Sequence, residues 1–339
     1  MSVGLDIGSR TIKIAELAPE GKTFRLKGSG VVGYKGASLE KLQDDKDLSA
    51  MAQIISKLHQ QAGISTKDVS IALPETQVFT RTIKFPLLTD QEIASAVKWE
   101  AEQYIPIPIN EAIVQHQILE RRESATPPEV AVLLVASARK LVEKYVKVIQ
   151  LAKLNPVAVE TELMAITRAL APENQTALVV DFGARSTDIA IAKNKQLSFS
   201  RSIPTAGNAL TRALAQNLGV SEQQAEEYKR TYGMATNQLE GKVKGALEPV
   251  FAMVVDEIKK AIHFHQSEEK GDAPVSAIVS GGTASMPEII SILTNTLGLE
   301  VSIANPFANV AVDSEAAKAL APYAPLYSIA VGLAMRPQE

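Results

Sequence analysis

Short apolar runs, separated by polar and glycine-containing stretches, predict a chain that alternates strands with helices. Residues 178–182 (LVVDF) and 129–137 (EVAVLLVAS) have the continuous, β-branched apolar character of buried strands. Residues 90–104 place apolar side chains at helical spacing, and Thr89 and Glu92 have the spacing of a capping box at the start of this helix. Pro106 requires the helix to stop just before it. A second amphipathic helix is predicted over residues 139–154. This mixture of elements is typical of an α/β protein.

One pattern occurs twice in the chain. Residues 3–17 read VGLDIGSRTIKIAEL, and residues 178–192 read LVVDFGARSTDIAIA. Each copy consists of an apolar strand, a glycine-containing turn and a second apolar strand, which is the signature of a β-hairpin. The aligned pairs are Asp6 with Asp181, Gly8 with Gly183, Arg10 with Arg185, and Ile14 with Ile189. Two such matches in one chain predict two related halves.

The two hairpins have the chemistry of a phosphate site. A glycine turn exposes backbone N–H groups to an anion, and an aspartate at the end of a strand can hold the waters of Mg²⁺. The turns add further donors, namely Ser9, Arg10, Thr11, Ser186 and Thr187. Two hairpins that face one another across a cleft would hold a triphosphate from both sides. Either hairpin alone is more simply interpreted as an ordinary β-turn.

A glycine pair near the C-terminal end of the chain fits the same site. The strand at residues 275–279 is followed by Gly281-Gly282-Thr283 and then by a predicted helix over residues 287–297. Ser285 and Glu288 have the spacing of a capping box at the start of that helix. Paired glycines before a helix let the backbone approach a nucleoside or phosphate closely.

Composition narrows the classes of protein that remain. The length of 339 residues favours two or more domains, and a net charge of −3 argues against a broad surface for nucleic acid. The absence of cysteine excludes disulfides and cysteine-based metal sites. The first residues lack a secretory signal, and the longest uncharged run, 319–335, contains two prolines. We therefore expect a cytoplasmic protein without direct membrane insertion.

The hairpins and the glycine pair resemble the actin-like ATPase superfamily, which includes actin, heat-shock chaperone ATPases, sugar kinases and FtsA. The resemblance implies an actin-like ATPase fold, in which two duplicated domains enclose a cleft for ATP or ADP with Mg²⁺. It places Asp6 and Asp181 near the metal, which they would contact through water, and makes them catalytic candidates together with Glu160. The implied nucleotide-binding residues are Gly8, Ser9, Arg10, Thr11, Lys13, Gly183, Ser186, Thr187, Glu226, Lys229, Arg230, Gly281, Gly282 and Thr283.

Two of these assignments have alternatives that the sequence leaves open. Residues 225–231 (AEEYKRT) are similar to the family helix beside the ribose and adenine, but a solvated charged helix has the same pattern. The motif around Glu160 is degenerate compared with the family. The resemblance therefore implies at most a slow ATPase.

A narrower resemblance is to the PilM family, cytoplasmic actin-like components of type IV pilus assembly that are related to FtsA. Residues 85–119, and within them WEAEQYIPIPI, are similar to the inserted subdomain of that family. The likeness implies a scaffold of the inner-membrane complex that binds the cytoplasmic N-terminal peptide of a PilN-type bitopic membrane protein. Helix 90–104 and the strand that ends Ile83-Lys84-Phe85 are the first candidates for the peptide groove. Contacts with other pilus components and self-association are further possibilities that the family implies.

These landmarks predict three units. Domain I comprises residues 1–85 and 154–176 with a closing helix at 319–339, the inserted subdomain comprises 86–153, and domain II comprises 177–318 with an outer helical part at 221–272. Trp99 is expected to pack in the subdomain. Because five residues follow Ala334, we expect no membrane anchor of the FtsA type. A small-molecule kinase of the sugar-kinase type and an FtsA-like filament former remain as alternative functions.

Overall fold

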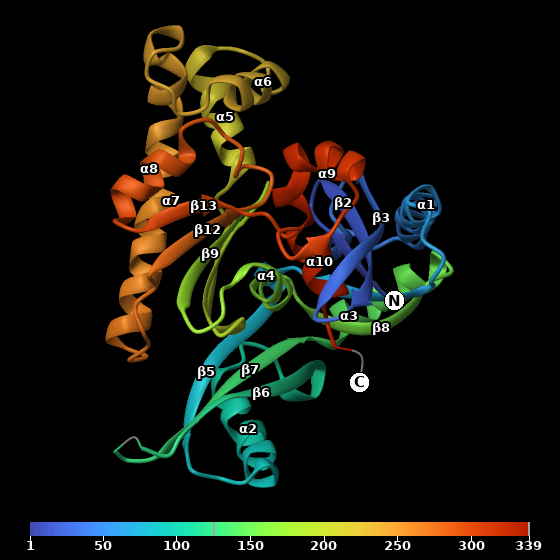
Figure 1. Cartoon of the computed structure of the whole chain (residues 1–339), viewed down its shortest axis with the longest axis vertical. Coiled ribbons are helices and arrows are strands. Elements are labelled where there is room, and N and C mark those ends of the chain that lie inside the picture. Colours follow the sequence, from blue (N-terminus) through green and yellow to red (C-terminus); the bar gives the residue numbers. More distant parts are fainter. Residues whose placement is uncertain (125, 338–339) are drawn as a thin grey trace.

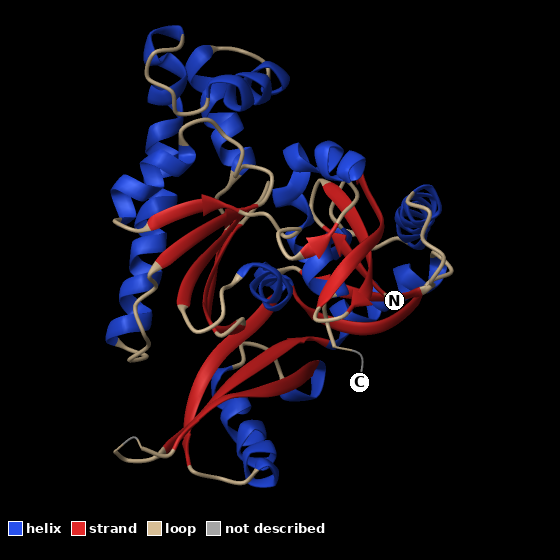
Figure 2. Ribbon diagram, viewed as in Figure 1, coloured by secondary structure: helices blue, strands red, loops and turns tan. Residues whose placement is uncertain are grey.

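The computed structural model describes residues 1–124 and 126–337, and in this part of the chain the strands form three sheets. Two of the sheets lie beside one another, and the third, with helix α2 (Asp90–Tyr104) packed on it, extends away from them (Figures 1 and 2). Helices fill the space between the sheets and cover their outer faces, so that each sheet has its own buried core. None of the helices in the described ranges is long and apolar enough to cross a membrane.

The first sheet has six strands in the order β14-β3-β2-β1-β4-β8. Their bounds are Val310–Ala311, Thr23–Gly33, Thr11–Glu20, Ser2–Ile7, Asp68–Leu73 and Asn155–Thr161. Helices α1 (Asp45–Gln61) and α3 (Arg139–Leu151) bury their apolar sides on one face. Helix α10 (Ser328–Ala334) packs on the other face, against β1 and β2. Because both faces are covered, β1 is buried along nearly its whole length.

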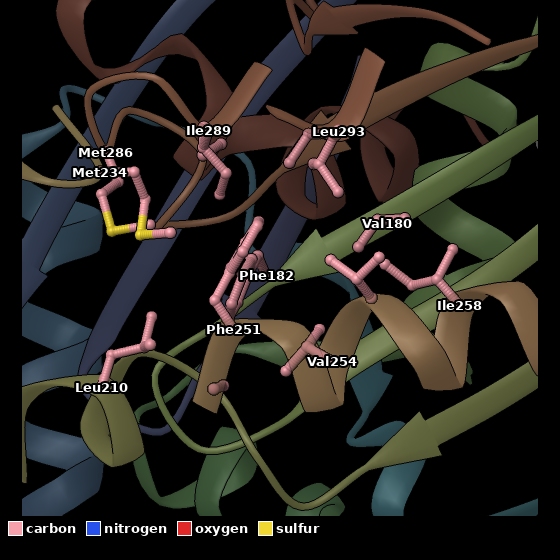
Figure 3. Close-up of a cluster of buried hydrophobic side chains, with 14 of the residues drawn as sticks. Val180, Phe182, Leu210, Met234, Phe251, Val254, Ile258, Met286, Ile289 and Leu293 are labelled. Atoms are coloured by element: carbon pink, nitrogen blue, oxygen red, sulfur yellow. The ribbon is translucent and has the colours of Figure 1, made fainter. Parts of the chain in front are cut away.

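The second sheet has five strands in the order β11-β10-β9-β12-β13. Their bounds are Gln196–Ile203, Thr187–Lys193, Thr176–Phe182, Ser276–Ser280 and Glu300–Ile303. The helices on this side of the molecule are α5 (Gly207–Leu218), α6 (Glu222–Tyr232), α7 (Lys242–Ser267) and α8 (Ile289–Leu297). Figure 3 shows the core that they form with the sheet, in which Phe182 of β9 stacks on Phe251 of α7 with ring centroids 6.2 Å apart.

The third sheet has the order β5-β7-β6, with bounds Val78–Pro86, Glu129–Ala138 and Ala112–Arg122. Helix α2 (Asp90–Tyr104) covers one face of it. The predicted capping box of Thr89 and Glu92 is confirmed, and the helix ends at Tyr104 as Pro106 requires. The other face of the sheet packs, through Leu133, on helix α4 (Glu162–Leu170). Helix α4 connects β8 of the six-stranded sheet with β9 of the five-stranded sheet.

Two local predictions were wrong. Trp99 is not packed in the subdomain but 73% exposed, because it lies on the side of α2 opposite to Val97 and Ala101. No capping box forms between Ser285 and Glu288, since Glu288 has a φ of +65° and α8 begins only at Ile289. The carbonyl of the preceding Pro287 instead accepts a hydrogen bond from Met234, which ties this turn to the end of α6.

The packing suggests other domain boundaries than those expected. Strand β5 already belongs to the three-stranded sheet at Val78, and α3 packs in the core of the six-stranded sheet. We therefore propose residues 78–138 as the inserted unit. The closing helix expected over 319–339 is divided into α9 (Ser314–Leu320), a 3₁₀ segment η5 (Ala321–Tyr327) and α10. Residues 338–339 of that prediction, and Ala125 of the expected subdomain, lie outside the described residues.

Candidate functional site

Both predicted hairpins are present, with matching pairing across their strands. In β1–β2, Asp6 stands opposite Lys13, and in β9–β10, Asp181 stands opposite Asp188. Directly opposed residues of an antiparallel pair place their side chains close together on the same face. The two copies therefore differ at one chemically important place. The first hairpin pairs opposite charges, whereas the second brings two carboxylates together.

The two turns meet at one cavity of about 1180 Å³. The glycine pair after β12, residues of α6 and the η5 segment complete its wall. Most of the residues that the sequence predicted for the site line this cavity: Asp6, Gly8, Ser9, Arg10, Thr11, Lys13, Asp181, Gly183, Ser186, Glu226, Lys229, Arg230, Gly281, Gly282 and Thr283. The structure thus brings the two hairpins and the glycine pair together, as the duplicated pattern predicts.

Two predicted residues lie elsewhere. The Thr187 side chain is fully buried, and its hydroxyl donates to the carbonyl of Thr205 at 2.7 Å. Glu160 is held by Arg168, which donates to both carboxylate oxygens at 2.7 Å and also to the Gly332 carbonyl. Neither residue is part of the cavity wall. Glu160 of β8 thus holds Arg168 of α4, which in turn joins α4 to α10.

The floor of the cavity is rich in carboxylates around one lysine. The Lys13 ammonium lies 2.6 Å from Oδ2 of Asp6, and both side chains are buried. Burial by itself would lower the pKa of Lys13, but the nearby carboxylates of Asp6, Asp181 and Glu162 raise it above its ordinary value. Lys13 is therefore charged at neutral pH and compensates part of this buried negative charge.

Two further carboxylates of the floor, Glu162 and Asp188, were missed by the sequence analysis. Burial raises the pKa of Asp188 to about 6, against the opposing effect of hydrogen bonds from Ser202 and Ser186. Burial and the Asp188 carboxylate raise the pKa of Asp181 to about 7. Burial, together with Asp6, raises the pKa of Glu162 well above its usual range. Asp188 could have been found from the alignment of the hairpins, where it takes the position of Lys13.

The second turn is fixed in place by hydrogen bonds to the carbonyl of Gly183. The Gly183 carbonyl accepts hydrogen bonds from Gly207 N at 3.1 Å and from Thr283 Oγ1 at 3.2 Å. Gly281 has a φ of +87°, and a Cβ at this position would lie 2.7 Å from Oδ1 of Asp181 and 2.6 Å from the Phe182 carbonyl. Only glycine therefore allows the glycine pair to approach the end of β9 so closely. The site is built on strand ends rather than on free loops.

The buried Lys229 and its hydrogen-bond partners form the cavity wall on the side of α6. Lys229 donates to Oε2 of Glu226 at 2.6 Å, to Oγ1 of Thr211 at 2.9 Å and to the Gly207 carbonyl at 3.1 Å. Burial lowers the pKa of Lys229, although the hydrogen bond that Lys229 donates to Glu226 opposes this shift. The segment is thus not a fully solvated charged helix, because Lys229 is buried and links α6 to α5.

The carboxylate floor suits a hydrated divalent cation. Oδ1 of Asp6 is buried and has no hydrogen-bond partner among the described residues, and Asp181 lines the same floor. Mg²⁺ is bound in proteins through one or two carboxylates with several waters, so this donor set fits the ion. Groups of three or more His, Asp or Glu side chains in metal-binding geometry are absent from the described ranges.

Glu75, beside this floor, predicts a dependence of stability on pH. Its backbone N–H donates to Glu162, and burial, with Asp188 nearby, raises its pKa from 4.5 to about 7. The folded chain therefore keeps a proton that the unfolded chain has lost. The resulting stability is complete below pH 4.5 and is lost as the pH rises through about 7.

We expect Glu75→Gln, which stays neutral at every pH, to be more stable than the wild type at pH 8 by on the order of 2 kcal/mol. At pH 4.5 the two proteins should have similar free energies of unfolding. Urea denaturation at both pH values measures this, with the exposed Glu102→Gln on α2 as the control. An equal effect of Glu75→Gln at both pH values would contradict the raised pKa.

The chain and its fold are similar to known proteins of several kinds. A family model described as type IV pilus assembly protein PilM matches residues 4–338. A chain of the solved PilM–PilN type IV pilus biogenesis complex has a TM-score of 0.84 and 27% identity, over 99% of this chain and 98% of that chain. FtsA of Streptococcus pneumoniae serotype 2 is 24% identical over 89% of this chain and 75% of its own length.

A more distant structural likeness concerns the fold alone. The structure of MreB 5 of Spiroplasma citri bound to AMPPNP has a TM-score of 0.56 and 14% identity, over 97% of this chain and 93% of that chain. Together with the likeness to the pilus complex, it confirms the predicted α/β, actin-like fold.

Proposed function

The chain belongs to the family of type IV pilus assembly proteins described as PilM, and from this membership we propose that it is an ATP-binding scaffold of the pilus assembly complex. In this proposal it lies in the cytoplasm and reaches the inner membrane through a PilN-type protein, whose cytoplasmic N-terminal peptide it binds. The observation that carries the nucleotide part is the meeting of two Asp–Gly hairpin turns at one cavity.

The charge distribution of the cavity supports a nucleotide with several phosphates. Carboxylates gather at the floor, whereas Arg10, Lys41, Arg185, Arg212 and Arg230 add positive charge elsewhere on the wall. The turns at Gly8 and Gly183 present backbone rather than bulky side chains to the space between them. In our proposal the phosphates lie between these turns, and the nucleoside lies between α6 and the glycine pair.

Mg²⁺ would be held through water by Asp6 and Asp181, and when bound it would neutralise charge on the phosphates. Lys13 fixes the orientation of the Asp6 carboxylate through their ion pair. Glu160 is engaged with Arg168, so it is not free to activate water. We therefore propose slow hydrolysis or none, with the bound nucleotide acting through the relative position of the two sheets.

The similarity to a chain of the PilM–PilN complex supports the choice of partner. On this chain the outer face of α2, with the exposed Trp99, and the neighbouring rim of the three-stranded sheet are our candidates for contacting the peptide. Phe85, a candidate from the sequence, is not available to the peptide, because its side chain is buried in the core beneath α2. Ile83 is partly buried against the same core.

The test is a titration of the purified chain with a labelled peptide that carries the cytoplasmic N-terminal sequence of the PilN-type protein from the same genome. Fluorescence anisotropy is recorded without nucleotide, with Mg²⁺–ADP and with Mg²⁺–AMPPNP, and a scrambled peptide is the control. We expect saturable binding whose affinity depends on the nucleotide. If the native peptide binds no better than the scrambled one under all three conditions, the proposed partner is wrong.

A further inference from the structure

Arg185 makes a contact across the cavity that the duplicated pattern does not explain. It lies at the tip of the β9–β10 turn, yet its guanidinium donates to Oγ of Ser38 and lies 3.6 Å from Oε1 of Glu40. Ser38 and Glu40 lie at the start of the short 3₁₀ segment that follows β3, on the side of the cavity formed by the six-stranded sheet. Arg185 thus connects two lobes of the molecule, which we define as the parts built on the five-stranded and on the six-stranded sheet.

The acceptor side of this contact is anchored independently of Arg185. Leu39 is fully buried in the core of the six-stranded sheet. Lys144 of α3 donates to the carbonyls of Glu40 and Leu42, at 3.0 and 2.6 Å. Tyr34 at the start of the segment donates its hydroxyl to the Gly8 carbonyl in the first turn. If Arg185 left, the backbone around Glu40 would keep its position.

The two partners are also accessible to a ligand in the cavity. The Arg185 side chain is 32% exposed and that of Glu40 is 16% exposed, and both line the cavity wall. Arginine binds phosphate with paired, charge-assisted hydrogen bonds, and a terminal phosphate carries more charge than a single carboxylate. A phosphate between the turns would therefore compete with Glu40 for the same guanidinium.

We propose that Arg185 distinguishes ATP from ADP by exchanging Glu40 for the terminal phosphate. With ADP it stays on Ser38 and Glu40 and holds the two lobes together at the mouth of the cavity. With ATP it turns to the phosphate and releases this contact. The inference rests on the proposed nucleotide site and adds to it the residue through which the number of phosphates changes the contact between the lobes.

The experiment measures the affinities of Mg²⁺–AMPPNP and Mg²⁺–ADP by isothermal titration calorimetry for the wild type, Arg185→Gln, Glu40→Gln and the double variant. Arg185→Gln should weaken AMPPNP binding about tenfold and ADP binding by less than about threefold. Glu40→Gln should strengthen AMPPNP binding about threefold, because it removes the competitor. In the Arg185→Gln background, Glu40→Gln should have no effect.

The controls separate this inference from loss of fold and from failure of the nucleotide site. Arg201→Gln removes a partly exposed arginine of the same sheet that pairs with Glu257, and it should leave both affinities unchanged. Circular dichroism melting checks that each variant is folded. Equal losses of AMPPNP and ADP affinity in Arg185→Gln would overturn the inference while leaving the nucleotide site in place. A wild type that binds neither nucleotide would overturn both.

Discussion

Replacing Lys13 with methionine is expected to lower the free energy of unfolding by about 3–5 kcal/mol, because it leaves the buried carboxylate of Asp6 without its counter-charge. Asp181 and Glu162 also interact with this ammonium, so the substitution removes a favourable charge interaction from each of them as well. If the cavity binds nucleotide as proposed, affinity should also fall at least about tenfold, since the floor loses its buried cation. Urea denaturation and nucleotide titration measure the two effects.

A matched control is the pair of Lys195 and Glu173, whose atoms lie 2.8 Å apart on the surface. Lys195→Met should cost less than about 1 kcal/mol, because exposed ion pairs contribute little. The double variant Asp6→Asn with Lys13→Met should regain part of the lost stability, since it removes the unpaired charge. If Lys13→Met is no more destabilising than Lys195→Met, the ion pair does not have the role described for it.

The second large effect is expected from Gly332→Ala in α10. A Cβ at this position would collide with the backbone carbonyl of Ala165 in α4, and backbone cannot move aside as a flexible side chain can. The two helices would have to separate, at a cost of about 2–4 kcal/mol in the free energy of unfolding. Because α4 connects the two large sheets, the separation should also disturb the cavity between them.

Gly245 in α7 provides the control for this substitution. It is also a helical glycine, but no atom lies within 4 Å of the Cβ that alanine would add. Gly245→Ala should therefore stabilise the protein by about 0.4–1 kcal/mol through the helix preference of alanine. Thermal and urea denaturation of the two variants should show shifts of opposite sign. Shifts of the same sign and size would show that α4 and α10 are packed less closely than described.

The duplicated motif made much of the fold predictable. The repeat of Asp6 and Asp181 identified both hairpins, and the register that follows from it places Lys13 and Asp188 at equivalent positions. The helix over residues 90–104 was predicted from its capping box and the proline behind it. These features depend on local sequence, so they can be read without knowledge of distant contacts.

Features that depend on distant packing could not be read in the same way. Glu160 and Glu162 stand two apart, and the sequence does not tell which of them reaches the cavity. Strand β8 ends at Thr161, whose side chain caps α4, so Glu162 turns into the cavity while Glu160 stays with Arg168. Trp99 illustrates the opposite case, since its size suggested packing whereas its place on α2 exposes it.

The arrangement of α10 over β1 has a consequence for biosynthesis. Gly4 of β1 lies against Ala330 and Leu333 of α10, so this strand is covered by a helix that is synthesised much later. Strand β14 likewise joins the edge of the N-terminal sheet only after residue 310 has been made. At roughly 5–20 residues per second, the ribosome needs tens of seconds to supply these pieces. During that time we expect the nascent sheet to expose the apolar face that α10 later covers, and chaperones to bind it there.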